Sequence, residues 1–190
     1  MIYPWLIVSF VAASRMTGQT VMIRETTVED VPLLMNLIAE KADFDRNVGA
    51  FASELQVTPE VLKTNLFGDH PFAFFVLACD EGEETPEKSV VGFANYHFRF
   101  SSFAGRPSLF LEDLFVRPEC RSQGTGKVLM NHLAQIAFSK GCNQLNWNSD
   151  GRNELGTKFC YRLGAEPVRQ TDHRCDWKWV SWELDEGKPL

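Results

Sequence analysis

The stretch that decides the fold is Leu109–Lys127, which reads LFLEDLFVRPECRSQGTGK. Its first part predicts a β-strand that carries two adjacent acids, Glu112 and Asp113, in an otherwise apolar run. A turn and a basic, glycine-rich loop follow, and a helix is expected to begin directly after them. Because free backbone N–H groups at a helix start favour an anion, the pattern indicates an anionic cofactor beside a proton-accepting group.

Composition restricts the class of protein. The chain has 190 residues, of which 44% are hydrophobic and 23% charged, as in one soluble globular domain. A net charge of −6 argues against a general nucleic-acid binder. The five cysteines and four histidines show no metal-ligand spacing, and the cysteine number is odd. We therefore expect a reduced, cytoplasmic protein without a metal site.

Residues 1–20 form an apolar N-terminal extension, and residues 21–190 are expected to make a single domain. The run Met1–Ser14 is too short to cross a bilayer and has no Lys or Arg, so no membrane association is expected. The alternatives for this segment are an extra strand, a cleaved signal peptide, or an upstream start codon ahead of Met16 or Met22.

Periodicity predicts a mixed α/β (α+β) protein. The element order favours a mixed sheet flanked by helices over a doubly wound one. Asp43–Phe51 is expected to be a polar loop. The predicted strands are 21–26, 72–79, 89–100, 109–116, 142–147 and 177–184, and the predicted helices are 27–41, 58–67, 125–138 and 153–163.

The loop after the predicted strand 109–116 has the spacing Arg121-x-x-Gly124-x-Gly126. Glycines allow the backbone to approach a phosphate closely, and Arg121 and Lys127 add positive charge. The loop matches neither the P-loop pattern nor the dinucleotide-binding fingerprint. Taken alone, a glycine pair before a helix is more often only a turn.

In its context, this loop resembles the pyrophosphate loop of the Gcn5-related N-acetyltransferase (GNAT) family, [R/Q]-x-x-G-x-[G/A] after a strand. Asn153 and the helix end Phe159–Ala165 extend the resemblance. Two further stretches, GFANYHF at Gly92–Phe98 and FGDHPF at Phe67–Phe72, are similar to the diamine and polyamine branch. The resemblance covers Met22–Val168 and implies the acyl-CoA N-acyltransferase fold, with a mostly antiparallel sheet.

The resemblance also implies acetyl-CoA as the cofactor, used as a co-substrate. The strand backbone after Asp113 would pair with the pantetheine arm, and the glycine-rich loop would hold the pyrophosphate. The residues implied to bind the cofactor are Leu114, Phe115, Val116, Arg121, Ser122, Gln123, Gly124, Thr125, Gly126, Lys127 and Asn153.

Acetyl transfer to an amine requires the ammonium to lose a proton and the leaving thiolate to gain one. Glu112 is the candidate base, directly or through a water, or else an anchor for the substrate; the alternative is a solvated strand position. Strand alternation would direct Asp113 to the opposite face. The resemblance implies that Phe44 and Asp45 contact the substrate, with Asp45 holding the second cationic end of a diamine. The alternative for Asp45 is an ordinary loop acid.

The proton donor to the thiolate is where the chain departs from the family. The diamine and polyamine branch, and much of the family, carries a tyrosine four residues before the glycine of its helix end, and here Cys160 occupies that position. Tyr161 is adjacent, but one helical residue is a rotation of about 100°. The alternatives are Cys160 as acid, Tyr161 through a distorted turn, water, or a Cys160 that is only a core residue.

The expected function is therefore transfer of an acetyl group from acetyl-CoA to the primary amine of a small substrate. Polyamines, diamines and lysine-like amino acids are the implied acceptors, with direct transfer in a ternary complex and a homodimer as the implied assembly. The alternatives are a CoA-binding regulatory or weakly active module, and an acetyltransferase of aminoglycosides or protein amines.

Overall fold

The computed structural model of the chain describes residues 11–14, 20–50, 53–80, 89–171 and 173–179. Its strands form one sheet with the order β1-β2-β3-β4-β5-β6-β8-β7, in which only β5 and β6 run parallel. The strands are β1 (Val11–Ser14), β2 (Thr20–Glu25), β3 (Phe74–Asp80), β4 (Val90–Ser101), β5 (Arg106–Val116), β6 (Leu145–Ser149), β7 (Glu166–Gln170) and β8 (Cys175–Trp179). The prediction of a mixed, mostly antiparallel sheet is confirmed.

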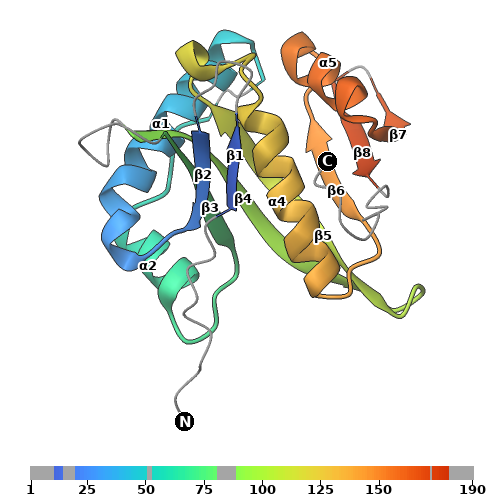
Figure 1. Cartoon of the computed structure of the whole chain (residues 1–190), viewed down its shortest axis with the longest axis horizontal. Helices are drawn as coiled ribbons and strands as arrows, with labels where there is room; N and C mark the ends of the chain where they lie inside the picture. Colours follow the sequence, from blue (N-terminus) through green and yellow to red (C-terminus); the bar gives the residue numbers. More distant parts are fainter. Residues whose placement is uncertain (1–10, 15–19, 51–52, 81–88, 172, 180–190) are drawn as a thin grey trace.

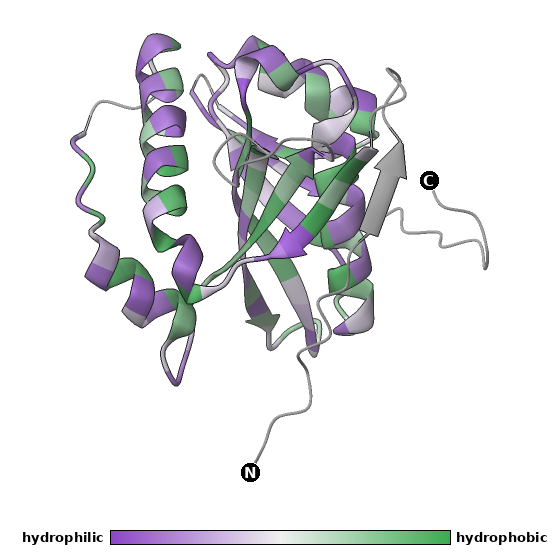
Figure 2. Cartoon of the chain, turned by 60° about the vertical axis from the view of Figure 1, so that its left-hand side comes forward, coloured by the Kyte–Doolittle hydropathy of each residue, from purple (hydrophilic) through white to green (hydrophobic). Residues whose placement is uncertain are grey.

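Helices cover both faces of this sheet (Figure 1). The first two helices and α4 enclose separate hydrophobic cores on opposite sides of strands β3, β4 and β5. The hydrophobic colouring of these strands in Figure 2 reflects their burial between the two layers. The helices are α1 (Val31–Asn47), α2 (Pro59–Phe67), α4 (Thr125–Ser139) and α5 (Glu154–Leu163), with short 3-10 turns at Val28–Asp30 and Pro118–Cys120.

The sequence explains the two-faced burial through strand alternation. On β3, Phe75 and Leu77 enter the core under α1 and α2, whereas Val76 and Ala78 enter the core under α4. Because both faces are covered, the strand reads as a continuous apolar run rather than an alternating one.

Helix α1 is longer than the sequence predicted. The polar run after Lys41 was expected to be a loop, but the helix continues to Asn47. Two ion pairs at helical spacing stabilise this extension, Lys41–Asp45 and Asp43–Arg46. Phe44 and Asp45 consequently project from a helix, which fixes their direction more firmly than a loop would.

The remaining differences are local. Strand β6 begins later than predicted, and β7, whose residues are all exposed, was not predicted. Residues beyond 179 of the predicted last strand lie outside the described residues. The backbone of β1 pairs with β2, so part of the N-terminal extension adds a strand to the sheet. The domain division itself stays a prediction.

Candidate active site between β5 and β6

Strand β5 carries a β-bulge at Glu112. Asn95 of β4 pairs with Asp113, but the next residue, Tyr96, pairs with Leu111, so Glu112 has no partner in the register. The core side chains are Leu109 and Leu111 before the bulge and Leu114 after it, which shows that the bulge shifts the alternation by one residue. Alternation therefore does not separate the two acids as predicted, and both Glu112 and Asp113 line the same cavity.

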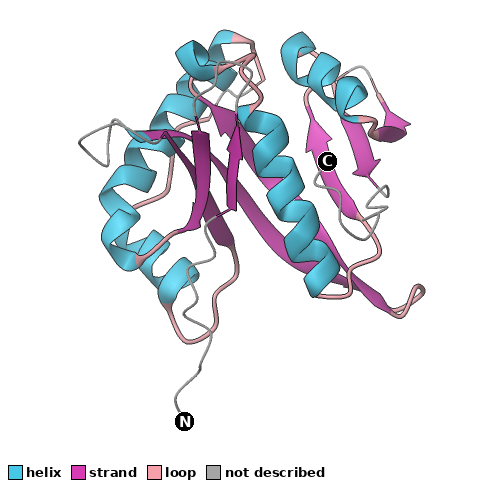
Figure 3. Ribbon diagram, viewed as in Figure 1, coloured by secondary structure: helices cyan, strands magenta, loops and turns pink. Residues whose placement is uncertain are grey.

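Beyond the bulge, β5 loses its neighbour on one side. The pairing with β6 is confined to Leu109–Leu111 opposite Leu145–Trp147. Figure 3 shows these two strands in the context of the sheet. The backbone of Glu112–Val116 therefore presents an edge that an extended ligand can pair with, as an added strand would.

A cavity of about 880 Å³ lies along this free edge. It is bounded by α1, β5, the glycine-rich loop, the start of α4, and α5. Gln123 and Tyr161 are the predicted site residues that do not line it. The predicted residues that do are Phe44, Asp45, Glu112, Leu114, Phe115, Val116, Arg121, Ser122, Gly124, Thr125, Gly126, Lys127, Asn153 and Cys160.

The glycine-rich loop has the geometry of an anion site. Ser122 and Gly124 adopt positive φ angles of 60° and 96°, a turn that gathers backbone N–H groups into a concave nest. The first intrahelical bond of α4 runs from the Val128 N–H to the Gly124 carbonyl at 3.1 Å, so the preceding N–H groups lie ahead of the helical ladder. The Oγ1 atom of Thr125 is buried without a hydrogen-bond partner. An orphaned hydroxyl in this position fits a phosphate oxygen.

Arg121 joins this loop to the strand. Its Nε donates to the Val116 carbonyl at 2.8 Å, and its guanidinium carbon lies 4.3 Å from the centre of the Phe44 ring. Burial lowers the pKa of Arg121 below its ordinary value. Arg121 therefore fixes the loop against β5 and α1, and its remaining N–H donors are available to an anion.

Asn153 caps the start of α5, and Gly126 lets α5 lie close to α4. Asn153 caps α5, since its Oδ1 accepts from the Gly156 N–H at 2.9 Å. A Cβ added at Gly126 would lie 3.3 Å from the Phe159 ring. Gly126 thus permits the close approach of α5 that closes one side of the cavity.

Two acids of the site, Asp45 and Asp113, form ion pairs with Lys41, which was not among the predicted site residues. The Nζ atom of Lys41 lies 2.8 Å from Oδ1 of Asp113 and 2.5 Å from Oδ2 of Asp45. Burial lowers the pKa of Lys41, but the two carboxylates outweigh this effect and raise it above its ordinary value. The four-residue spacing of Lys41 and Asp45 could have indicated this ion pair on a helix. The prediction of a loop from Asp43 onward concealed it.

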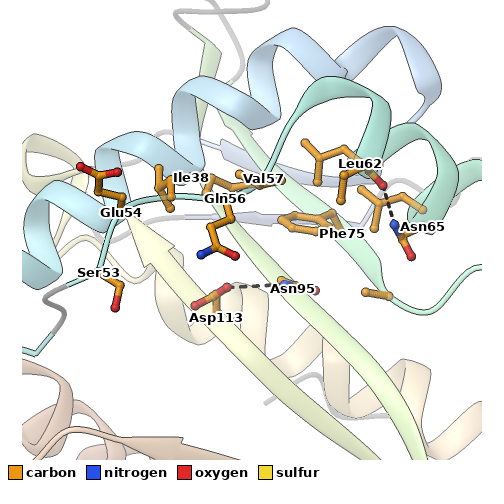
Figure 4. Close-up of a pocket in the computed structure, with 14 residues that line it drawn as sticks. Ile38, Ser53, Glu54, Gln56, Val57, Leu62, Asn65, Phe75, Asn95 and Asp113 are labelled. Carbon is orange, nitrogen blue, oxygen red and sulfur yellow. Dashed lines mark hydrogen bonds between the residues drawn. The ribbon is translucent and has the colours of Figure 1, made fainter.

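A second cavity, of about 450 Å³, lies on the other side of Asp113 between α1 and α2 (Figure 4). Its walls are mainly apolar and include Ile38, Leu62 and Phe75. In the close-up, Gln56 points toward Asp113, and Asn95 Nδ2 donates to Asp113 Oδ2 at 3.5 Å. Asp113 therefore separates the large cavity from an apolar space under the helices.

The two candidate proton donors occupy different environments. Cys160 is buried against the large cavity, where its thiol accepts a hydrogen bond from the Trp147 indole N–H at 3.3 Å. Burial raises the pKa of the Cys160 thiol to about 11. Tyr161 is 55% exposed, and its ring packs edge-on against Trp177 at 5.0 Å between centroids. The structure thus brings Cys160 into the site and leaves Tyr161 outside the cavity lining.

The described residues lack both a membrane-spanning helix and a cluster of metal ligands. They contain no helix that is long and apolar enough to cross a membrane. In the same part of the chain, no three His, Cys, Asp or Glu side chains gather in a group that could hold a metal ion.

The fold and this cavity define an acyltransferase of the GNAT type, and comparison with known proteins agrees. Residues 38–165 match the model of the acetyltransferase (GNAT) family. The chain belongs to this family, and it is an N-acetyltransferase.

Among curated proteins, the chain is similar to thialysine N-epsilon-acetyltransferase of Bos taurus, with 31% identity over 79% of this chain and 96% of that protein. It is also similar to spermidine/spermine N(1)-acetyltransferase-like protein 1 of Homo sapiens, with 29% identity over 76% of this chain and 21% of that protein.

Solved structures share the fold at low sequence identity. The GNAT domain of S. lividans PAT superposes with a TM-score of 0.70 at 17% identity, over 94% of this chain and 99% of that one. PaiA N-acetyltransferase from Thermoplasma acidophilum, solved in complex with coenzyme A, superposes with a TM-score of 0.62 at 17% identity, over 84% and 98% of the two chains.

Proposed function

We propose that the protein transfers the acetyl group of acetyl-CoA directly to the primary amine of a small substrate, with both substrates bound together. One observation carries the proposal: the free edge of β5, the nest at the start of α4, and the bulged Glu112 all line a single cavity. A cofactor with an extended amide arm and a pyrophosphate needs the first two features, and an amine acceptor needs the third.

Two segments of the chain would bind different parts of the cofactor. The backbone of Leu114–Val116, which has no strand partner on the β6 side, would pair with the pantetheine arm, and the nest from Ser122 to Lys127 would hold the pyrophosphate. The unpartnered Thr125 hydroxyl supports this placement, because phosphate oxygens would supply the acceptor that it lacks. Gln123 would take part through its backbone, and Asn153 through the side chain with which it caps α5.

Glu112 is proposed as the proton acceptor for the attacking amine. The bulge releases it from the alternation of β5, and among the described residues no cation forms an ion pair with it. Its side chain is exposed in the protein alone, so bound substrates would have to exclude water before it could act as an effective base. A role as an anchor for the substrate ammonium uses the same position.

Water is proposed as the proton donor to the leaving thiolate. A thiol whose pKa is raised to about 11 is a weaker acid than an ordinary thiol, which makes Cys160 a poor donor. Tyr161 would need a change of helix geometry to reach the cavity. The same raised pKa keeps Cys160 protonated at neutral pH, which disfavours an acetyl-cysteine intermediate and favours direct transfer.

The proposed acceptors are polyamines, diamines and lysine-like amino acids. The names of the two curated relatives support this class. A homodimer and a cytoplasmic location belong to the same proposal, the latter supported by the absence of disulfides among the five cysteines, all of which lie in the described part of the chain.

The test measures CoA thiol release from acetyl-CoA with a panel of small primary amines. Release that depends on both the amine and the enzyme is expected, together with an N-acetylated product by mass spectrometry. The buried, weakly acidic Cys160 favours one second candidate, a CoA-binding module with little catalysis. That candidate predicts CoA binding in calorimetry without thiol release for any amine.

A further inference from the structure

We infer that Lys41 selects against acceptors with a second cationic end, so that the preferred substrates carry one net positive charge at the reacting amine. This inference rests on the proposed function and narrows its substrate class: among the proposed acceptors it disfavours polyamines and diamines and keeps lysine-like amino acids, whose far end carries no net positive charge. It follows from the position of Lys41 between the two acids, Asp45 and Asp113, that would otherwise attract a second ammonium.

The helix and the strand build this arrangement together. Lys41 and Asp45 lie one turn apart on α1, and Asp113 faces them from β5 directly after the bulge. The three side chains are only 23%, 20% and 26% exposed, respectively. All three line the large cavity, so the ion pairs form part of its wall.

The ammonium of Lys41 occupies the position beside Asp45 and Asp113 that the far ammonium of a diamine would need. A carboxylate that already pairs with a lysine attracts an incoming ammonium less than a carboxylate without a cation beside it. Here Lys41 contacts one oxygen of each acid, and the carboxylates hold its pKa above the ordinary value, so it remains charged at neutral pH. An incoming ammonium would meet a cluster with one net negative charge in place of two, together with the like charge of Lys41.

The space beyond Asp113 does not offer a substitute anion. The smaller cavity is lined mainly by apolar side chains, which suit methylene groups rather than a charge. Its two acids are Asp113, paired with Lys41, and Glu54, which is exposed to solvent. An uncharged acceptor tail therefore fits this space (Figure 4) better than an ammonium.

The experiment uses two acceptors of equal length. Cadaverine carries an ammonium at its far end, and n-hexylamine carries a methyl group there. The ratio of their kcat/KM values is measured for the wild-type chain and for Lys41→Met. We expect the wild type to prefer n-hexylamine and the variant to shift the ratio toward cadaverine by about tenfold or more, because two carboxylates become available.

Two control variants isolate the charge in the cavity wall. Lys41→Arg keeps the charge and should keep the wild-type preference. Arg46→Met removes the same charge from the same helix, at a residue that does not line the cavity, and should leave the ratio unchanged. A purely structural role of Lys41 would lower both kcat/KM values together without changing their ratio.

A binding measurement decides the inference separately from turnover. Calorimetry of cadaverine with each CoA-saturated protein should show binding tighter by about tenfold in Lys41→Met than in the wild type. Equal affinity, or an unchanged kcat/KM ratio, would overturn the role of Lys41. Absence of turnover with either amine in every protein would instead count against the proposed function, while the affinities would still decide the inference.

Discussion

The indole N–H of Trp147 on β6 donates a hydrogen bond to the thiol of Cys160 on α5 at 3.3 Å. This contact joins the two elements that face β5 across the cavity, at the position where the family resemblance led us to expect a tyrosine. The thiol is therefore held as an acceptor within the wall of the cavity, and burial raises its pKa to about 11. The relationship indicates a packing role for Cys160 rather than a role as acid.

Replacement of Cys160 tests this role. Cys160→Ala should keep kcat within about threefold of the wild type, because water supplies the proton, and should lower the free energy of unfolding by roughly 1–2 kcal/mol through the lost packing. Tyr161→Phe should likewise retain activity. Steady-state kinetics and urea unfolding provide the measurements, and a fall in kcat of a hundredfold in either variant would make that residue the acid.

Replacement of Glu112 tests the proposed base. Glu112→Gln keeps the shape of the side chain but removes the proton acceptor, so kcat/KM for a small amine should fall by about a hundredfold, while CoA affinity changes little. Glu119→Gln is the matched control, since Glu119 lies in the turn before the loop and does not line the cavity. Equal activity of the two variants across pH would remove Glu112 from the mechanism.

Replacement of Thr125 tests the cofactor site. Thr125→Val removes an unpartnered buried hydroxyl, so the stability of the protein alone should stay equal or rise. If that hydroxyl binds a phosphate oxygen, the Kd for CoA should rise by about tenfold or more. Thr157→Val is the control, because the Thr157 hydroxyl is also buried without a partner but lies outside the cavity lining. Calorimetry that finds the same CoA affinity in both variants would contradict this placement.

The Arg24–Asp30 pair provides a stability prediction with a defined pH dependence. Arg24 donates two hydrogen bonds of 2.7 Å to Asp30, and the Thr27 N–H donates a third of 2.9 Å. Burial raises the pKa of Asp30, but Arg24 and Thr27 outweigh it, and the pKa lies below its ordinary value. Because the folded pKa is depressed, this carboxylate stabilises the protein above the unfolded pKa of about 3.9, and the contribution is lost as pH falls through the folded pKa.

Asp30→Asn should therefore lower the free energy of unfolding by about 2–3 kcal/mol at neutral pH. The difference from the wild type should shrink as the pH falls below about 4, because Asp30 is then protonated first in the unfolded state and, at lower pH, in the folded state. Urea unfolding at a series of pH values measures this. A difference that stays constant from neutral to acidic pH would show that the carboxylate charge contributes nothing.

The features that the sequence predicted well are local ones. The spacing of Arg121, Gly124 and Gly126 ahead of a helix specifies a nest without reference to any distant residue, and the structure has that nest. The apolar runs of β3, β4 and β5 likewise predicted strands, and burial on both faces explains why these runs are continuous.

The features that the sequence did not predict depend on pairs of distant elements. The bulge at Glu112 arises from the pairing register between β4 and β5, so it cannot be predicted from the sequence of either strand alone. The polar composition after Lys41 suggested a loop. The helix continues there, and the Lys41 ammonium points inward because it pairs with Asp113 of β5, a contact that the sequence of the helix does not reveal. The Trp147–Cys160 contact needed β6 and α5 to be placed together in the same way.

The central claim is direct acetyl transfer to a small amine in the cavity between β5 and β6. The most direct measurement follows acetyl-CoA with an isotopically labelled acetyl group in the presence of n-hexylamine, with mass spectrometry of both the amine and the protein. We predict that the label appears on the amine in equal amount to the CoA released, with none on the protein. Bound CoA without labelled product for any small amine, or a label that accumulates on Cys160, would contradict the account.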